Sequence, residues 1–483
     1  MDKQTFASGA IWKIVEVFST KGISLIISII LARILLPEDY GIITLTAVFI
    51  SLSTILVQSG LSTALIRKEK VDEIDYNSGF ITGFSIALVC YIVFFCGVSV
   101  IADFYNEQLL IPVLRIQMLS LFLVAFGNIQ TVIITREFRF RELCIANIVA
   151  NSISGLIGIV LAYSGFGVWS LVFYTLLRDG ISSFVVFLRI KWHPRFKYDL
   201  SRMRSLLGFS IWVLAATIVD FIGNNYSSTI MGKKYSLSEL GLYNKGNQIP
   251  EMICLYTFGA ISSVLLPTLS SYQKDKERLK HVCKRLVEMS SYIIFPMMVG
   301  LGLIADKVVP FLFTEKWNAS VPIFIFACIS YGVNPLRVIN MQLIYALGDS
   351  KKGLLVEIIR SALLITGGTL CAFVFKTSIY GISGVAAGVS IVNLLITQLY
   401  VKKYIKYGYR EWIRDMLPAL GLCAGIVLTV YFVGLLPLQT YVLMFIQIAA
   451  GVCVYLVMSI VTHNTSFYEV KTILLEKFSR RIQ

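Results

Sequence analysis

Long apolar stretches recur along almost the whole chain and are separated by short polar segments. A helix needs about 20 consecutive, mostly apolar residues to cross a hydrocarbon core, and about fourteen stretches meet that length. Strands of a membrane β-barrel are shorter and alternate apolar with polar residues, so they would not give such runs. The pattern predicts an all-α polytopic membrane protein with about 14 transmembrane helices. The stretches are 11–34, 40–62, 77–102, 110–135, 143–163, 166–188, 206–231, 240–266, 287–312, 320–346, 353–375, 379–401, 415–435 and 439–462.

The composition excludes several other classes of protein. Of the 483 residues, 57% are hydrophobic and 15% are charged, and the mean hydropathy is +0.77. Soluble domains carry roughly 25% charged residues, so a soluble enzyme, a disordered chain and a secreted disulfide scaffold are excluded. The nine cysteines form no CxxC pair, and we expect them to be small buried hydrophobic residues. Histidines occur only in loops or at a helix end, so we predict no metal site and no resident cofactor; they are His193, His281 and His463.

Lysine and arginine residues alternate between the predicted loops in a way that sets the orientation. If the N-terminus is cytoplasmic, about 30 of these cations fall on the cytoplasmic side and about six on the other. Both termini are therefore predicted to be cytoplasmic, in a bacterial inner membrane. The formal charge of +15 does not indicate nucleic acid here, because the basic loops 189–204 and 274–285 are expected to face anionic lipids of the inner leaflet.

The chain shows signs of an internal repeat with an offset of 200 residues. Ile11-Trp12 opens the first helix and Ile211-Trp212 opens the seventh, while Gly41 and Gly241 each mark the start of the next helix. Six helices followed by six similar helices is a common plan among transporters. We predict a six-helix lobe over 1–190, a basic cytoplasmic linker over 191–205, a second six-helix lobe over 206–403, and helices 13 and 14 with a cytoplasmic tail over 404–483.

The first helix of each predicted half carries a polar stripe. On a wheel of 100° per residue, Lys13, Glu16, Lys21 and neighbouring Ser and Thr residues fall within an arc of about 140°. In the seventh helix, Asp220 lies on a similar stripe. Charged residues near a helix centre cost roughly 2.5–3.5 kcal/mol on insertion scales, so the stripes are expected to face protein or water. We infer a wet cavity between the halves; the alternative is local pairing, such as Lys13 with Glu16.

Cations exceed the nearby carboxylates within the helices. Glu357 and Arg360 are three residues apart and can pair, and Arg178 lies next to Asp179. Surplus positive charge in a cavity suits an anionic substrate, above all one that bears phosphate. The candidate substrate-binding residues are Lys13, Lys21, Arg115, Arg178, Lys245, Arg337 and Arg360.

Motifs for the common catalytic chemistries are absent from the sequence. It contains no G-x-x-x-x-G-K-[ST], no G-x-S-x-G and no H-E-x-x-H. The predicted loops are too short to hold an extramembrane reaction domain. The sequence therefore favours transport over catalysis, and we predict that the protein is not an enzyme.

Two segments of the first third of the chain carry a recognisable pattern: Leu31-Ala-Arg-Ile-Leu-Leu-Pro-Glu-Asp-Tyr-Gly41, which is the more specific, and Val57-Gln-Ser-Gly-Leu-Ser-Thr-Ala-Leu-Ile66. They resemble the Wzx-type polysaccharide flippases, transporters of O-antigen and lipopolysaccharide biosynthesis within the multidrug/oligosaccharidyl-lipid/polysaccharide exporter superfamily. Further similar segments are Leu240-Gly-Leu-Tyr-Asn-Lys-Gly-Asn-Gln248 and Leu343-Ile-Tyr-Ala-Leu-Gly-Asp349. The resemblance implies two six-helix lobes in a V shape plus two C-terminal helices.

The resemblance also implies a substrate and a mechanism. The substrate is an undecaprenyl-pyrophosphate-linked oligosaccharide, moved from the inner to the outer leaflet by alternating access, with glycosyltransferases and a glycan polymerase as functional partners. By the same resemblance, Lys21 and Lys245 fit the places where relatives hold the pyrophosphate. Glu16 and Asp220 are candidates for coupling to H+ or Na+. A cation/drug antiporter of the same fold, a membrane glycan polymerase or ligase, and a scaffold without transport activity are the alternatives.

Overall fold

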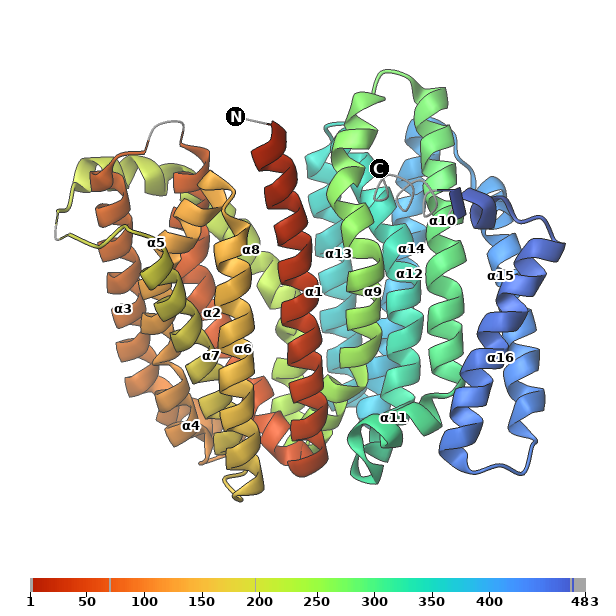
Figure 1. The fold of residues 1–483 in the computed structure, drawn as a ribbon, viewed down its shortest axis with the longest axis horizontal. Coiled ribbons are helices and arrows are strands. Elements are labelled where there is room, and N and C mark those ends of the chain that lie inside the picture. Colours follow the sequence, from red (N-terminus) through yellow and green to blue (C-terminus); the bar gives the residue numbers. More distant parts are fainter. Residues whose placement is uncertain (1–2, 69–70, 196, 470, 473–483) are drawn as a thin grey trace. The chain divides into compact units, whose positions relative to one another are not determined.

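The computed structural model describes residues 3–68, 71–195, 197–469 and 471–472 (Figure 1). Within these ranges the chain is helical and contains no strand. The helices are α1 (Lys3–Ile34), α2 (Pro37–Arg67), α3 (Glu73–Tyr105), α4 (Leu110–Gln117), α5 (Ser120–Glu137), α6 (Phe140–Tyr163), α7 (Val168–Arg189), α8 (Leu200–Lys234), α9 (Leu237–Ser271), α10 (Lys276–Leu303), α11 (Ala305–Phe313), α12 (Val321–Ala346), α13 (Ser350–Thr369), α14 (Ile379–Ile405), α15 (Tyr409–Gly434) and α16 (Thr440–Val461).

The helices confirm the predicted fold class. Each predicted apolar stretch coincides with a helix or with a consecutive pair of helices. In the described part of the chain, 12 segments are long and apolar enough to cross a membrane. The protein is therefore an all-α, multi-pass membrane protein, as the periodic apolar stretches predict.

Two predicted helices are each broken into a pair. The stretch 110–135 divides into α4 and α5 at Met118 and Leu119, and 287–312 divides into α10 and α11 at Ile304. All three residues at the breaks are apolar, so hydropathy gives no signal of the change in direction. The short helices α4 and α11 occupy corresponding places before α5 and α12, which agrees with a repeated plan.

The predicted basic loop 274–285 is mostly helix, and this part of the prediction is wrong. Helix α10 begins at Lys276, where the Asp275 side chain accepts a hydrogen bond of 3.0 Å from the Arg278 amide and caps the first turn. Leu279 and Cys283 are buried on the inner face of this extension. The helix therefore continues beyond the apolar stretch, because packing and capping rather than hydropathy set its start.

Contacts divide the chain into two compact units, Met1–Gly241 and Leu242–Gln483. In the first unit, α1 packs against α6, α6 packs against α7, and α8 packs against α2 and α3. In the second unit, α12 packs against α14, and α10 packs against α15, which also contacts α16. The unit boundary falls at 241 because α8 packs with the helices that precede it. The lobes 1–190, 206–403 and 404–483 with their linker 191–205 remain a prediction from sequence.

Within the first unit, the starts of α2 and α9 cross at two glycines. A Cβ placed on Gly41 would lie 2.0 Å from the carbonyl oxygen of Leu237, and one on Gly241 would lie 1.9 Å from that of Pro37. The two contacts are related by the offset of 200 residues. The helix starts are also capped alike, since Asp39 accepts from the Leu36 amide and Glu239 accepts from the Ser236 amide, both at 2.9 Å. The sequence offset therefore has a counterpart in three dimensions.

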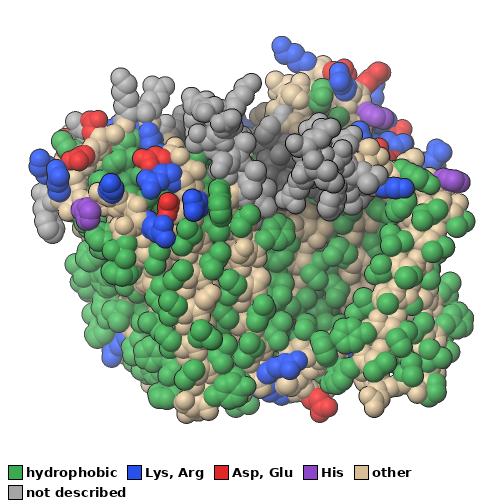
Figure 2. Space-filling model, viewed as in Figure 1, with side chains coloured by type: hydrophobic (Ala, Val, Ile, Leu, Met, Phe, Trp, Pro, Cys, Tyr) green, Lys and Arg blue, Asp and Glu red, His purple; other side chains and the backbone are tan. Residues whose placement is uncertain are grey.

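Side-chain chemistry differs between the flanks and the ends of each unit (Figure 2). Hydrophobic side chains dominate the flanks, as expected for surfaces that contact lipid. Lys and Arg side chains gather at one end of each unit. In the first unit this end carries the segment between α7 and α8, and in the second it carries the turn between α9 and α10.

Candidate functional site

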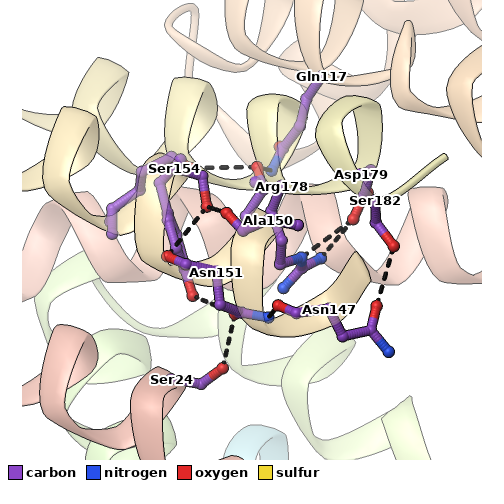
Figure 3. A network of polar contacts seen from close by, with 12 residues as sticks. Ser24, Gln117, Asn147, Ala150, Asn151, Ser154, Arg178, Asp179 and Ser182 are labelled. Carbon is purple, nitrogen blue, oxygen red and sulfur yellow. Dashed lines mark hydrogen bonds and ion pairs between the residues drawn. The ribbon is translucent and has the colours of Figure 1, made fainter. Parts of the chain in front are cut away.

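A polar network joins α1, α6 and α7 inside the first unit (Figure 3). Glu16 on α1 is buried, with 7% of its surface exposed, and its carboxylate accepts a hydrogen bond of 2.8 Å from Asn147 on α6. The side-chain oxygen of Asn147 accepts in turn from the Ser182 hydroxyl on α7, at 2.9 Å. Lys13 forms a salt bridge of 2.8 Å with Glu16. The buried carboxylate therefore has both an ionic and an amide partner, as burial of a charge requires.

The polar contacts continue one to two turns further along the same helices. The Ser24 hydroxyl donates to the side-chain oxygen of Asn151 at 2.9 Å, and the Tyr174 hydroxyl reaches the same oxygen at 3.4 Å. On α7, the Arg178 guanidinium donates two hydrogen bonds to Asp179, at 3.0 and 2.9 Å, and its centre lies 5.9 Å from the Tyr174 ring. Arg178 is thus part of this network and is held by a neighbouring carboxylate.

The two candidate cations of α1, Lys13 and Lys21, differ in their partners. The Lys13 side chain is 47% exposed and paired with Glu16, which is the local pairing that the sequence left open as an alternative. Lys21 is exposed, and no described residue forms an ion pair with it. The polar stripe is therefore partly used for packing against α6, and Lys21 is the member of the stripe that is open to another charged group.

A second charged cluster lies in the second unit, on α12 and α13. Glu357 accepts from Arg337 at 2.7 Å and from Arg360 at 2.6 Å, through its two different carboxylate oxygens. The side-chain oxygen of Asn334 accepts from Nε and Nη2 of Arg337, both at 3.2 Å. The sequence suggested only the local pairing of Glu357 with Arg360; the structure adds Arg337 from the neighbouring helix.

The remaining candidates do not join these clusters. Lys245 on α9 is 2% exposed, donates to Gln248 at 2.9 Å, and lies 5.4 Å from the Phe313 ring. Arg115 on α4 lies 4.3 Å from the ring of Phe95, an exposed residue of α3. Asp220 belongs to α8, and its side chain lies outside the described residues. The structure thus encloses Lys245 within the second unit and places Arg115 against an exposed aromatic side chain.

Sequence reasoning missed the residues that hold the first cluster together. Asn147, Asn151 and Ser182 are uncharged, and the charge count on which the candidates were chosen does not include them. The sequence does contain a pattern that indicates them, because polar residues at positions 147, 151 and 154 repeat at helical spacing within an apolar stretch. In a bilayer, such residues are expected to bond across helices.

A large apolar cavity lies in the second unit between α10, α11, α15 and α16. It has a volume of about 910 Å³ and is lined almost throughout by aliphatic and aromatic side chains, among them Met297, Phe311 and Leu456. A smaller cavity of about 330 Å³ shares Tyr292 with it and is lined by two cations and two carboxylates, Lys284, Arg414, Glu288 and Asp415.

The described part of the chain contains no group of three or more His, Cys, Asp or Glu residues that could hold a metal ion. The nine cysteines are free, and most are buried.

The architecture defines the class: an all-α polytopic membrane protein. The fold matches a structure titled "Lipid II flippase MurJ, inward closed conformation" with a TM-score of 0.77, at 17% identity, over 94% of this chain and 99% of that one. It also matches an inward-facing multidrug resistance MATE family transporter of the MOP superfamily with a TM-score of 0.61, at 15% identity, over 80% of this chain and 96% of that one.

Sequence comparison then gives the family. The family described as "Polysaccharide biosynthesis protein" matches residues 30–322, and the chain belongs to it. This membership confirms the resemblance to polysaccharide flippases.

Relatives include the succinoglycan biosynthesis transport protein ExoT of Rhizobium meliloti, 24% identical over 67% of this chain and 65% of ExoT. The lipopolysaccharide biosynthesis protein WzxC of Escherichia coli is 23% identical over 85% of this chain and 83% of WzxC. The teichuronic acid biosynthesis protein TuaB of Bacillus subtilis is 24% identical over 83% of this chain and 84% of TuaB.

Proposed function

We propose that the protein moves an undecaprenyl-pyrophosphate-linked oligosaccharide from the inner to the outer leaflet of the bacterial inner membrane, for surface polysaccharide biosynthesis. Both termini are cytoplasmic in this proposal, and the two units alternate between inward and outward access. The relatives named above support the substrate class, because their names place them in exopolysaccharide, lipopolysaccharide and teichuronic acid biosynthesis.

The observation that carries the proposal is the presence of arginines inside candidate membrane-crossing helices of both units. Arg178 lies in the candidate span Val168–Arg189, and Arg337 lies in the span Glu315–Ala346. Charges at such depth are costly and mark the paths of polar substrates. A pyrophosphate needs that kind of partner, because guanidinium groups bind phosphate oxygens in pairs and offset the loss of hydration.

The apolar cavity between α10, α11, α15 and α16 supports the lipid part of the proposal. A polyprenyl chain must stay in an apolar environment while its head group crosses. A cavity of about 910 Å³ with an almost wholly apolar lining provides that environment.

Translocation in proteoliposomes tests the proposal. Purified protein is reconstituted with a fluorescent polyprenyl-pyrophosphate oligosaccharide, and glycan that becomes accessible on the opposite face is measured with an added glycosidase. We expect translocation by the wild-type protein and a loss of at least tenfold in Arg178→Gln and Arg337→Gln, since each removes a charged hydrogen-bonding group. Absence of translocation by the wild-type protein, together with efflux of a cationic dye, would favour the drug antiporter instead.

Lysine variants and a gradient test address the remaining assignments. If Lys21 contacts the pyrophosphate, Lys21→Ala slows translocation, whereas the enclosure of Lys245 predicts that Lys245→Ala acts mainly on stability. For ion coupling, Asp220→Asn and Glu16→Gln should abolish the response of translocation to an imposed H+ or Na+ gradient. Translocation that responds to the gradient equally in both variants would remove these carboxylates from the coupling role.

A further inference from the structure

Glu357 is a carboxylate shared by two arginines inside the second unit. Its two oxygens lie 2.7 Å from Arg337 and 2.6 Å from Arg360. The three side chains are partly open, with 22% of Arg337, 28% of Glu357 and 18% of Arg360 exposed. The cluster is therefore buried enough for its ion pairs to be only weakly screened by solvent, and it is exposed enough for a ligand to reach it.

The two arginines hold the oxygens of Glu357 in the way that an anion-binding site holds the oxygens of its ligand. Guanidinium groups present hydrogen-bond donors in a fixed fork, and this fork fits the oxygens of carboxylates and of phosphates equally well. A phosphate placed between Arg337 and Arg360 would accept the same two sets of hydrogen bonds that the Glu357 carboxylate now accepts. The carboxylate also offsets part of the charge of the two arginines within the membrane when no ligand is bound, and it leaves one net positive charge.

We propose that Glu357 is an internal counter-ion that holds the place of a substrate phosphate between Arg337 and Arg360, and that a phosphate group displaces it on binding. The inference rests on the proposed function and deepens it, because it assigns the phosphate to this site and gives Glu357 a role in release. When the phosphate leaves, the carboxylate returns to the two arginines, so the arginines have an anionic partner in both forms.

Asn334 makes such an exchange feasible. Its side-chain oxygen accepts two hydrogen bonds from Arg337 at 3.2 Å, on nitrogens Nε and Nη2, while Nη1 donates to Glu357. The amide therefore fixes the guanidinium from a side that the carboxylate does not use. Arg337 stays oriented when Glu357 moves away, and Asn334 is a positioning residue of the site.

A second carboxylate in the chain offers a matched control. Glu142 also lies between two arginines, Arg139 at 4.0 Å and Arg189 at 3.4 Å. These arginines are 42% and 48% exposed, and their contacts are longer. Because these arginines are largely exposed to solvent and their contacts with Glu142 are long, removal of Glu142 should change the affinity for phosphate little.

Binding of farnesyl pyrophosphate to the full chain in nanodiscs tests the proposal, with farnesol as a probe that has the same tail without phosphate. We expect Glu357→Gln to bind farnesyl pyrophosphate about tenfold more tightly than the wild type, because the internal competitor is gone. The affinity for farnesol should not change. Glu142→Gln should leave both affinities within about twofold, and adding Arg337→Gln to Glu357→Gln should abolish the gain.

The purely structural role of Glu357 predicts a different result. It predicts that Glu357→Gln lowers the melting temperature and that farnesyl pyrophosphate binds no more tightly, which would overturn the proposal. Glu357→Asp is a milder variant for the case in which Glu357→Gln is not recovered folded. The shorter carboxylate reaches the arginines less well, so we expect a gain of about threefold, and no gain overturns the proposal.

The failure of this inference can be told apart from failure of the proposed function. Wild-type protein that translocates the lipid-linked oligosaccharide, combined with no gain in Glu357→Gln, removes only the counter-ion role. Wild-type protein that fails to translocate it removes the proposed function itself.

Discussion

The crossing of α2 and α9 gives a sharp prediction, because two glycines meet the backbone of the opposite helix. In Gly41→Ala the new methyl group would lie 2.0 Å from the Leu237 oxygen, and in Gly241→Ala it would lie 1.9 Å from the Pro37 oxygen. An ordinary contact needs at least about 3.4 Å, so the helices must separate by more than 1 Å. Backbone atoms cannot rotate aside as a side chain can.

The cost can be set against the ordinary benefit of alanine in a helix. Overpacking in a close-packed region costs about 1–3 kcal/mol, whereas Gly to Ala in a helix interior gains about 0.5–1 kcal/mol. The difference between the two ranges is about 0–2.5 kcal/mol, and because the new methyl groups meet backbone atoms we expect a loss in its upper part, about 1–2.5 kcal/mol. Gly97→Ala and Gly22→Ala have no atom within 4 Å of the new methyl group, so they should be neutral or stabilising.

Thermal unfolding of the purified protein in detergent measures the effect. A loss of 1 kcal/mol lowers the melting temperature by about 2–4 °C for a domain of 150–250 residues, the size range of the first unit. The double variant Gly41→Ala/Gly241→Ala adds a second test. Once the helices have separated to admit one methyl group, the other fits at little further cost, so the two effects should not add.

Two outcomes would refute this reasoning. If Gly41→Ala is as well tolerated as Gly97→Ala, the close approach of the helix starts does not contribute to stability. If the losses in the double variant simply add, the two glycines act at separate places rather than at one crossing.

Three further predictions concern polar contacts. Tyr407 is buried and donates to Asp415 at 2.6 Å. Burial, with this hydrogen bond, raises the pKa of Tyr407, so it stays a donor. Tyr407→Phe should lose about 1–3 kcal/mol by chemical denaturation, and the half-buried control Tyr409→Phe less. Hydrogen bonds from Lys352 and Tyr404 hold the pKa of Asp349 below its ordinary value. The ionised carboxylate therefore stabilises the folded protein at neutral pH, and this stabilisation is lost as the pH falls through the lowered pKa. The melting temperature of Asp349→Asn should accordingly depend less on pH below 5 than that of the wild type. Asn147→Leu removes the amide partner of buried Glu16 and should lower the melting temperature and slow translocation, whereas unchanged values for both would show that the network is dispensable.

The sequence determined the class of protein and most of the helices. Apolar stretches of about 20 residues have one stable solution in a bilayer, so the helix positions follow from hydropathy to within a few residues at most ends. The offset of 200 residues also held, because Gly41 and Gly241 are placed where two backbones approach closely. These features are local, or they repeat, and the one-dimensional pattern therefore records them.

Only the tertiary structure decided which charges meet. Glu16 bonds to Asn147, 131 residues away, and Glu357 bonds to Arg337 on the preceding helix, while Lys245 is enclosed and Arg115 lies against Phe95. A helix wheel gives the face on which a residue lies, but it does not identify the helix that covers that face. The identity of the partner depends on how neighbouring helices pack, and packing is a property of side-chain shape over distant segments.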